Sequence, residues 1–121
     1  MVRSTYTVFY NRKTTTRFKG DDVMNTTLCE AIDQGELIEF EYEGLVRIVE
    51  PYIYGVGQNG ELLLKGFQTG GFNKKNDNSY TWDVYQVEKM GTVQFVGKGF
   101  NHERAGYEKN DPQFSTIYCQ R

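Results

Sequence analysis

Four basic residues between positions 47 and 104 have the chemistry to hold an anion: Arg47, Lys65, Lys89 and Arg104. Arginine grips a phosphate or carboxylate through two parallel N–H donors, and lysine contributes a compact positive charge. For each of them the competing interpretation is a solvated or ion-paired surface residue, and Glu39, Glu41 and Glu43 are partners close in sequence. An anion site requires a fold that gathers these side chains into one cleft.

The stretch KGFQTGG, residues 65–71, is a second candidate. It leaves an apolar run and ends on polar residues and two glycines, namely Gln68, Thr69, Gly70 and Gly71. Glycines let backbone amides approach a ligand, and successive amides can form a nest for an anion. The alternative is a hairpin loop that needs positive φ.

Aromatic residues form the third candidate set: Tyr52, Tyr54, Phe67, Trp82, Tyr85 and Tyr107. Their rings could stack on nucleic-acid bases. For most of them, packing in the core is the competing interpretation. Trp82 stands between polar neighbours, so we expect it to be partly exposed.

Catalytic and cofactor signatures are weak. His102, the only histidine, adjoins Glu103 and Arg104, but a lone histidine in a polar segment indicates a solvent-facing residue rather than acid–base catalysis. The cysteines and the histidine lack metal-ligand spacing. GVGQNG matches G-x-G-x-x-G by letter, yet it lies in a predicted β-hairpin with no helix after it. We therefore expect no enzyme activity, no metal and no cofactor.

Length, charge and cysteine content limit the classes of protein to which this chain can belong. With 121 residues and 14.0 kDa the chain fits one domain, and a net charge of −2 argues against broad, sequence-blind binding of nucleic acid. Cys29 and Cys119 are too few for a secreted disulfide framework, and we expect free buried thiols. Neither a long apolar run nor a signal-peptide pattern is found, which predicts a cytoplasmic protein with no membrane partner.

The N-terminal part predicts strands and then a helix. Residues 4–10 and 14–18 are rich in threonine and aromatics, which is typical of two short strands, and we assign residues 1–24 to an N-terminal β extension. Thr27 and Glu30 form a capping box that predicts the helix start, and Gly35 predicts its end. The main domain is then expected to span residues 25–121.

After Gly35 the pattern changes to alternation. Residues 38–42 alternate apolar side chains with glutamates, Glu43–Gly44 predicts a tight turn, and Asn59–Gly60 predicts a hairpin. Pro51 marks a strand end, an edge or a bend. Further strands are expected within 61–67, 79–90 and 92–97, before a polar loop and a last apolar stretch at 114–119. Five short strands with tight turns predict a small closed barrel with the helix at its flank.

The ordered set LCEAIDQGELIEFEYEGLVRIVEPYIYGVGQNGELLLKGFQTGG and WDVYQVEKM resembles the WYL domain. Of the family's Trp-Tyr-Leu-like triplet, which falls on residues 62–64, only Leu64 matches. Arg47 and Lys65 match basic family positions, whereas Asp83 and Gln86 stand where arginines are expected. The tail is similar to that of stand-alone WYL-like proteins of bacteria and phage.

The resemblance implies a mainly β fold, an SH3/Sm-like five-stranded barrel, and a regulatory role. It implies binding of an anionic ligand, a nucleotide or short single-stranded nucleic acid, and a phage protein of this kind could sequester a nucleotide signal in defence. The chain has no room for a helix-turn-helix domain. The alternative is a protein-interaction or oligomerisation module, an inhibitor or accessory subunit, whose N-terminal strands pair into a homo-oligomer.

Overall fold

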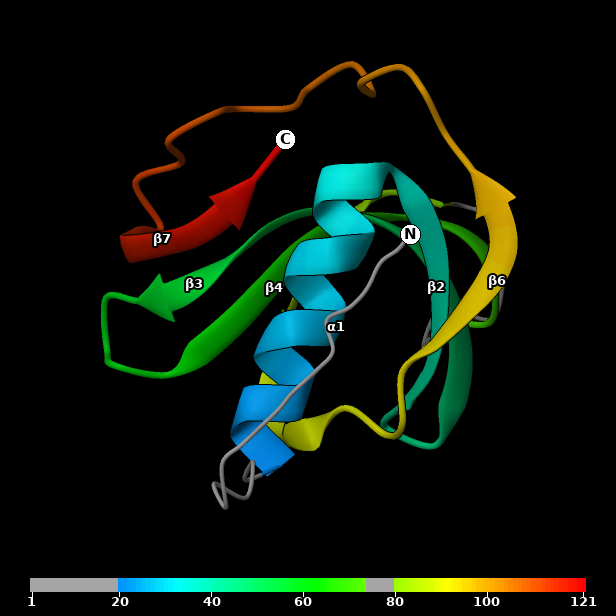
Figure 1. Ribbon diagram of the computed structural model, residues 1–121, viewed down its shortest axis with the longest axis horizontal. Helices are drawn as coiled ribbons and strands as arrows, with labels where there is room; N and C mark the ends of the chain where they lie inside the picture. Colours follow the sequence, from blue (N-terminus) through cyan, green and yellow to red (C-terminus); the bar gives the residue numbers. More distant parts are fainter. Residues whose placement is uncertain (1–19, 74–79) are drawn as a thin grey trace, which may run out of the picture.

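The computed structural model describes residues 20–73 and 80–121, and within them the chain is mainly β. One helix precedes a six-stranded antiparallel sheet (Figure 1). The elements are α1 (Gly20–Gln34), β2 (Glu36–Tyr42), β3 (Leu45–Gly57), β4 (Leu62–Gly71), β5 (Trp82–Gln86), the 3-10 helix η2 (Val87–Lys89), β6 (Gln94–Gly99) and β7 (Phe114–Gln120). The strands predicted at 4–10 and 14–18 lie outside the described residues.

Helix α1 begins earlier than the sequence suggested. It starts at Gly20, so Thr27 lies inside the helix and the predicted capping box is wrong. The predicted end is confirmed, because Gly35 has a φ of 69° and stops the helix. Leu28, Ala31 and Ile32 are fully buried on one face of α1, as their spacing predicts.

Strands β2, β3 and β4 form a meander whose turns follow the sequence. Glu43 and Gly44 both have positive φ, 54° and 79°, as a two-residue hairpin turn requires. Asn59–Gly60 connects β3 to β4, which confirms the second predicted hairpin. In β2 the buried residues Ile38, Phe40 and Tyr42 alternate with more exposed glutamates, so one face of the strand meets the core.

Pro51 lies at a bend in the long strand β3. Along one edge, β3 pairs with β2 as far as Val49 and with β7 from Ile53 onward, so the partner changes around Pro51. On the other edge the register with β4 shifts between Pro51 and Ile53. Because proline has no N–H to donate, the ladder is interrupted there at low cost. The bend brings β7, which the sequence did not predict as a strand, into the sheet.

The sheet is open rather than a closed barrel. Its order is β5-β4-β3-β2-β6, with β7 paired to β3. After β5 the chain turns through η2, where it meets β2 at the Tyr42–Met90 bridge and through the Gly91 N–H donated to the Glu41 carbonyl at 2.8 Å. Strand β5 has five residues and forms no ladder with β6 at the other end of the strand order, so no closure is found among the described residues.

Two apolar clusters lie on opposite faces of the sheet. Neighbouring strand residues point to opposite faces, and Leu64 belongs to the cluster under α1 whereas Leu63 belongs to the other. The second cluster contains Tyr52, Ile53 and Phe114 and is extended by residues of segment 100–113, which we call the tail segment. Figure 1 shows α1 lying across the sheet and the tail segment arching from β6 back to β7.

A disulfide joins Cys29 of α1 to Cys119 of β7. Their Cα atoms are 5.6 Å apart although 90 residues separate them in sequence, so the prediction of free thiols is wrong. The packing of the last strand beside α1 brings them together, and no local pattern signals it. A disulfide does not support the expected cytoplasmic location. Within the described residues, no helix is long and apolar enough to cross a membrane.

Gly71 gives a direct test of the β3–β4 register. Its φ is 79°, and a Cβ added there would lie 2.2 Å from the Val46 carbonyl oxygen. We expect Gly71→Ala to lower the free energy of unfolding by about 2–4 kcal/mol, through backbone strain and overpacking. Gly44→Ala is the matched control, with the same φ and nothing within 4 Å of its Cβ. It should cost only about 1–2 kcal/mol in urea titrations, and equal losses would contradict the register.

Candidate ligand pocket

Arg47 is buried on the α1 face of the sheet. It donates to the Tyr42 carbonyl at 3.2 Å, and its Nη2 is 3.6 Å from the Glu43 carboxylate. Its Nε is buried and has no hydrogen-bond partner within the described part of the chain. Arg47 is therefore a buried cation near the β2–β3 turn and not part of a shared cleft.

Two other predicted cations lie on the opposite face, and each has its own carboxylate. The Lys65 ammonium pairs with Asp111 of the tail segment and lies 5.6 Å from the Trp82 ring centroid. Arg104 pairs with Glu50. Lys89 is exposed at the end of η2. The expected convergence of the four cations is therefore wrong, because strand alternation sends Arg47 and Lys65 to different faces.

The KGFQTGG segment is part of strand β4. Gln68, Gly70 and Gly71 pair with Val49, Ile48 and Arg47 of β3. The buried Gln68 amide donates to the carbonyls of Gly70 and Phe72, both at 2.8 Å. Neither a bare anion nest nor a hairpin loop is present at these positions, so both interpretations are wrong. Thr69 is the member of the segment that reaches a pocket.

The predicted aromatic residues pack against one another. Tyr52 is fully buried, with its ring centroid 4.7 Å from that of Trp82 and 4.9 Å from that of Tyr107. Trp82 is partly exposed, as predicted, and its indole N–H donates to the Ala105 carbonyl at 3.0 Å. Tyr85 lies in the other cluster, edge-on to Phe40 at 5.0 Å. Core packing explains these rings better than base stacking.

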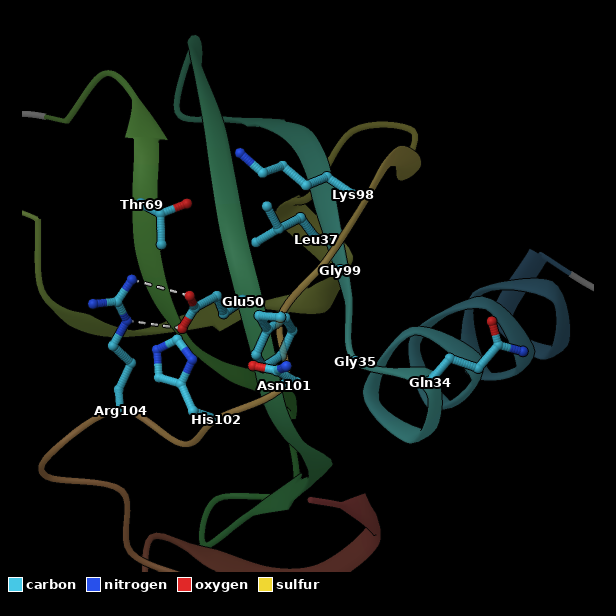
Figure 2. Close-up of a pocket in the computed structure, with 11 residues that line it drawn as sticks. Gln34, Gly35, Leu37, Glu50, Thr69, Lys98, Gly99, Asn101, His102 and Arg104 are labelled. Carbon is cyan, nitrogen blue, oxygen red and sulfur yellow. Dashed lines mark hydrogen bonds and ion pairs between the residues drawn. The ribbon is translucent and has the colours of Figure 1, made fainter.

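A pocket of about 660 Å³ lies between the end of α1, β6 and the start of the tail segment. Figure 2 shows the Arg104 guanidinium and the His102 ring directed toward the Glu50 carboxylate, and the Lys98 side chain extended toward the side that Thr69 occupies. Leu37 and Phe100 add apolar surface. Of the residues predicted from sequence to bind ligand, Thr69 and Arg104 line this pocket.

Glu50 and Arg104 form the best-defined polar pair of the pocket. The Arg104 Nε and Nη2 donate to the two Glu50 oxygens at 3.0 and 3.1 Å. The Tyr52 hydroxyl donates to Glu50 at 3.1 Å and accepts the Arg104 backbone N–H at 2.9 Å. The guanidinium carbon lies 4.7 Å from the Phe67 ring centroid. Two donor bonds and an aromatic contact therefore hold Arg104 in one orientation.

The protonation states in this network follow from its contacts. The hydrogen bond to Glu50 raises the pKa of Arg104, although partial burial acts against it. Burial raises the pKa of Tyr52 to about 12, with the Arg104 backbone N–H acting in the opposite direction. At neutral pH Arg104 is therefore charged and Tyr52 is a neutral hydroxyl.

Lys98 gives the pocket its remaining positive charge. Arg104 and Glu50 neutralise each other, whereas Lys98 has no carboxylate partner among the residues described. Thr69 and Asn101 supply neutral hydrogen-bonding groups. Sequence reasoning missed Lys98 and Glu50 as pocket residues. Glu50 gave no signal, and Lys98 gave only its place between two glycines.

The pocket lining combines a guanidinium, an ammonium and a carboxylate with apolar surface. Among the described side chains, no group of three histidine, cysteine, aspartate or glutamate residues could hold a metal ion. The fixed guanidinium and the unpaired lysine are anion-binding groups. Comparisons with protein-family models, curated proteins and solved structures find no match to this chain.

Proposed function

We propose that this protein is a non-enzymatic regulatory module that binds an anionic ligand, a nucleotide or a short single-stranded nucleic acid, in the pocket beside Arg104. The sequence resemblance to the WYL domain supports a module of this type. In a phage setting such a module would sequester a nucleotide signal used in defence.

The observation that carries the proposal is that one pocket is lined both by the Arg104 guanidinium, which Glu50 and Phe67 orient, and by Lys98, which has no carboxylate partner among the described residues. Glu50 accepts from Nε and Nη2 of Arg104, and Nη1 has no hydrogen-bond partner among the described residues. Because the guanidinium is already ordered by Glu50 and Phe67, a ligand loses less binding free energy to ordering it. Lys98 can then move onto the anion from β6.

The size and lining of the pocket also fit a small organic anion. About 660 Å³ is within the range of small-molecule sites, and Leu37 and Phe100 offer surface for an apolar part of the ligand. The overall charge of −2 favours a local site of this kind over extended nucleic-acid binding. Short oligonucleotides are therefore expected to bind through one terminal or flipped-out nucleotide.

Calorimetric titration with cyclic mononucleotides and short oligonucleotides tests the proposal. We expect at least one to bind, and Lys98→Ala to weaken that binding by about 10- to 100-fold, the effect of one charged hydrogen bond. Lys89→Ala is the matched control, because Lys89 is an exposed lysine outside the pocket. If none of these ligands binds at high micromolar concentration, or if both variants bind alike, the pocket is not the site.

A protein-interaction module remains the second candidate, and one surface favours it. Phe72, Val46 and Tyr80 are exposed by 59 %, 41 % and 36 %. They are neighbours, since the Phe72 N–H donates to the Val46 carbonyl at 2.8 Å and the Tyr80 hydroxyl donates to Gly71 at 3.4 Å. Exposed apolar side chains grouped in this way are typical of contact surfaces. The molar mass from light scattering distinguishes a homo-oligomer of this type from a monomeric binder.

A further inference from the structure

We propose that the Cys29–Cys119 disulfide is a redox switch for the pocket, and that its reduction loosens the pocket wall formed by Gly35 and Phe100. The two sulfurs belong to α1, whose last residue Gln34 lines the pocket, and to β7, which does not line it. A short series of contacts through Arg121 connects the disulfide to the wall. Ligand identity plays no part in this coupling.

Arg121 follows the disulfide by two residues and binds both layers of the fold. Its backbone N–H donates to the Tyr52 carbonyl at 3.0 Å, and its Nη1 donates to the Ile32 carbonyl of α1 at 2.7 Å. The Ile32 carbonyl near the end of α1, which also accepts the Gly35 N–H at 3.4 Å, thus receives a hydrogen bond from the residue that follows β7. Any displacement of β7 from α1 moves this donor away.

Arg121 also contacts the pocket wall itself. Its guanidinium carbon lies 4.7 Å from the Phe100 ring centroid, and its carbonyl accepts the Tyr107 hydroxyl at 2.8 Å. The Phe100 N–H donates to the Gly35 carbonyl at 2.7 Å. Since Gly35 and Phe100 both line the pocket, the position of Arg121 sets the position of that wall.

The Arg121 position needs a constraint, which the disulfide supplies. The Arg121 Nε is buried without a hydrogen-bond partner among the described residues. A buried donor without an acceptor favours any movement that exposes it to water. With the disulfide closed, Cys119 cannot leave α1, so Arg121 stays in place. With the disulfide open, hydration of the Arg121 side chain competes with its contacts to Ile32 and Phe100.

The switching reaction is thiol–disulfide exchange with a dithiol. One thiolate attacks a sulfur of the pair and forms a mixed disulfide, and the second thiol of the reductant then releases it. Two electrons and two protons pass to Cys29 and Cys119, and the reductant leaves as a cyclic disulfide. Both cysteines are partly rather than fully buried, so each residue has some surface open to solvent.

Reduction is expected to act locally. Helix α1 remains attached to the sheet through Leu28, Ala31 and Ile32, all of which are fully buried. The ladder between β3 and β4 contains neither cysteine. The pocket wall and the end of β7 can therefore loosen while the central sheet keeps its structure.

Amide hydrogen exchange of the full chain, with and without dithiothreitol, tests the switch. We expect the Phe100 and Arg121 amides to exchange at least about 10-fold faster after reduction, through a local opening whose rate hardly depends on urea concentration. The β3–β4 amides should exchange through global unfolding, with a strong urea dependence, and should accelerate only by the loss of global stability. The double variant Cys29→Ser/Cys119→Ser should show the fast pattern without reductant and should not respond to it. Unchanged exchange at Phe100, exchange at Phe100 with the same urea dependence as the β3–β4 amides, or two free thiols in the unreduced protein would each overturn the proposal.

A second variant tests the route through Arg121. In the oxidised protein, Arg121→Gln should reproduce the faster exchange at Phe100 while the disulfide stays closed. Lys109→Gln, a change at an exposed residue of the tail segment, is the matched control and should leave Phe100 unchanged. If Arg121→Gln behaves like Lys109→Gln, Arg121 does not carry the coupling and the proposed mechanism fails.

Discussion

Asp111→Ala is expected to lower the free energy of unfolding by about 3–5 kcal/mol, which is the cost of leaving a buried charge without its partner. The Asp111 side chain is 2 % exposed and the Lys65 side chain 10 % exposed. After the substitution the Lys65 ammonium would remain under the Trp82 ring without a carboxylate. Chemical denaturation followed by tryptophan fluorescence measures the loss, because Trp82 is the only tryptophan.

Removing both charges separates pairing from packing. Lys65→Met/Asp111→Leu should recover most of the lost stability, since apolar residues of similar volume replace a buried ion pair at little cost. Glu108→Ala changes an exposed carboxylate of the same tail segment and should have an effect within about 0.5 kcal/mol. An Asp111→Ala loss as small as that of Glu108→Ala would show that the pair does not fasten the tail segment.

The same pair determines part of the acid sensitivity. Burial raises the pKa of Asp111, but the Lys65 ammonium and the Gln113 N–H outweigh it, so the pKa lies below its ordinary value. Because the pKa of Asp111 is lower in the folded than in the unfolded protein, its ionisation stabilises the fold. This stabilisation is fully present above the unfolded-state pKa of about 3.9 and is lost as the pH falls through the folded-state pKa. Below about pH 4, the stability advantage of the natural protein over Asp111→Asn should therefore shrink.

Local patterns in the sequence predicted the centre of the fold correctly. Gly35 ends the helix, and the Glu43–Gly44 and Asn59–Gly60 turns connect β2, β3 and β4. Each of these features depends on a few consecutive residues whose backbone preferences are strong. The helix start was misplaced because the capping pattern at Thr27 also occurs within a helix, where packing overrides it.

Features that depend on distant residues were missed. The tail segment is held by Lys65–Asp111 and Glu50–Arg104, which join residues 46 and 54 positions apart. Strand β7 depends on the bend at Pro51, which opens one edge of β3 to a new partner. The residue types of the predicted cations were suitable for binding an anion. The carboxylate partner or the direction of each side chain depends on contacts that exist only in the folded chain. As a result, the pocket lies beside Arg104 and does not include the other three cations.

The disulfide should make the other large contribution to stability. We expect Cys29→Ser/Cys119→Ser to lower the free energy of unfolding by about 2–5 kcal/mol, because the bond closes a loop that restricts the unfolded chain. Its two ends are 90 residues apart, which includes most of the sheet. Urea denaturation of the natural and the double-variant protein, both without reductant, measures the difference.

The slope of the same titrations shows where the stabilisation arises. A chain crosslinked over this span is more compact when unfolded, so removing the bond should expose more surface on unfolding and raise the m-value. Loss of native contacts would instead lower the midpoint without raising m. Reduced natural protein should match the double variant in both parameters, since both lack only the bond. If oxidised and reduced protein unfold with the same midpoint and slope, then Cys29 and Cys119 are not joined in solution, and α1 and β7 are held together by packing alone.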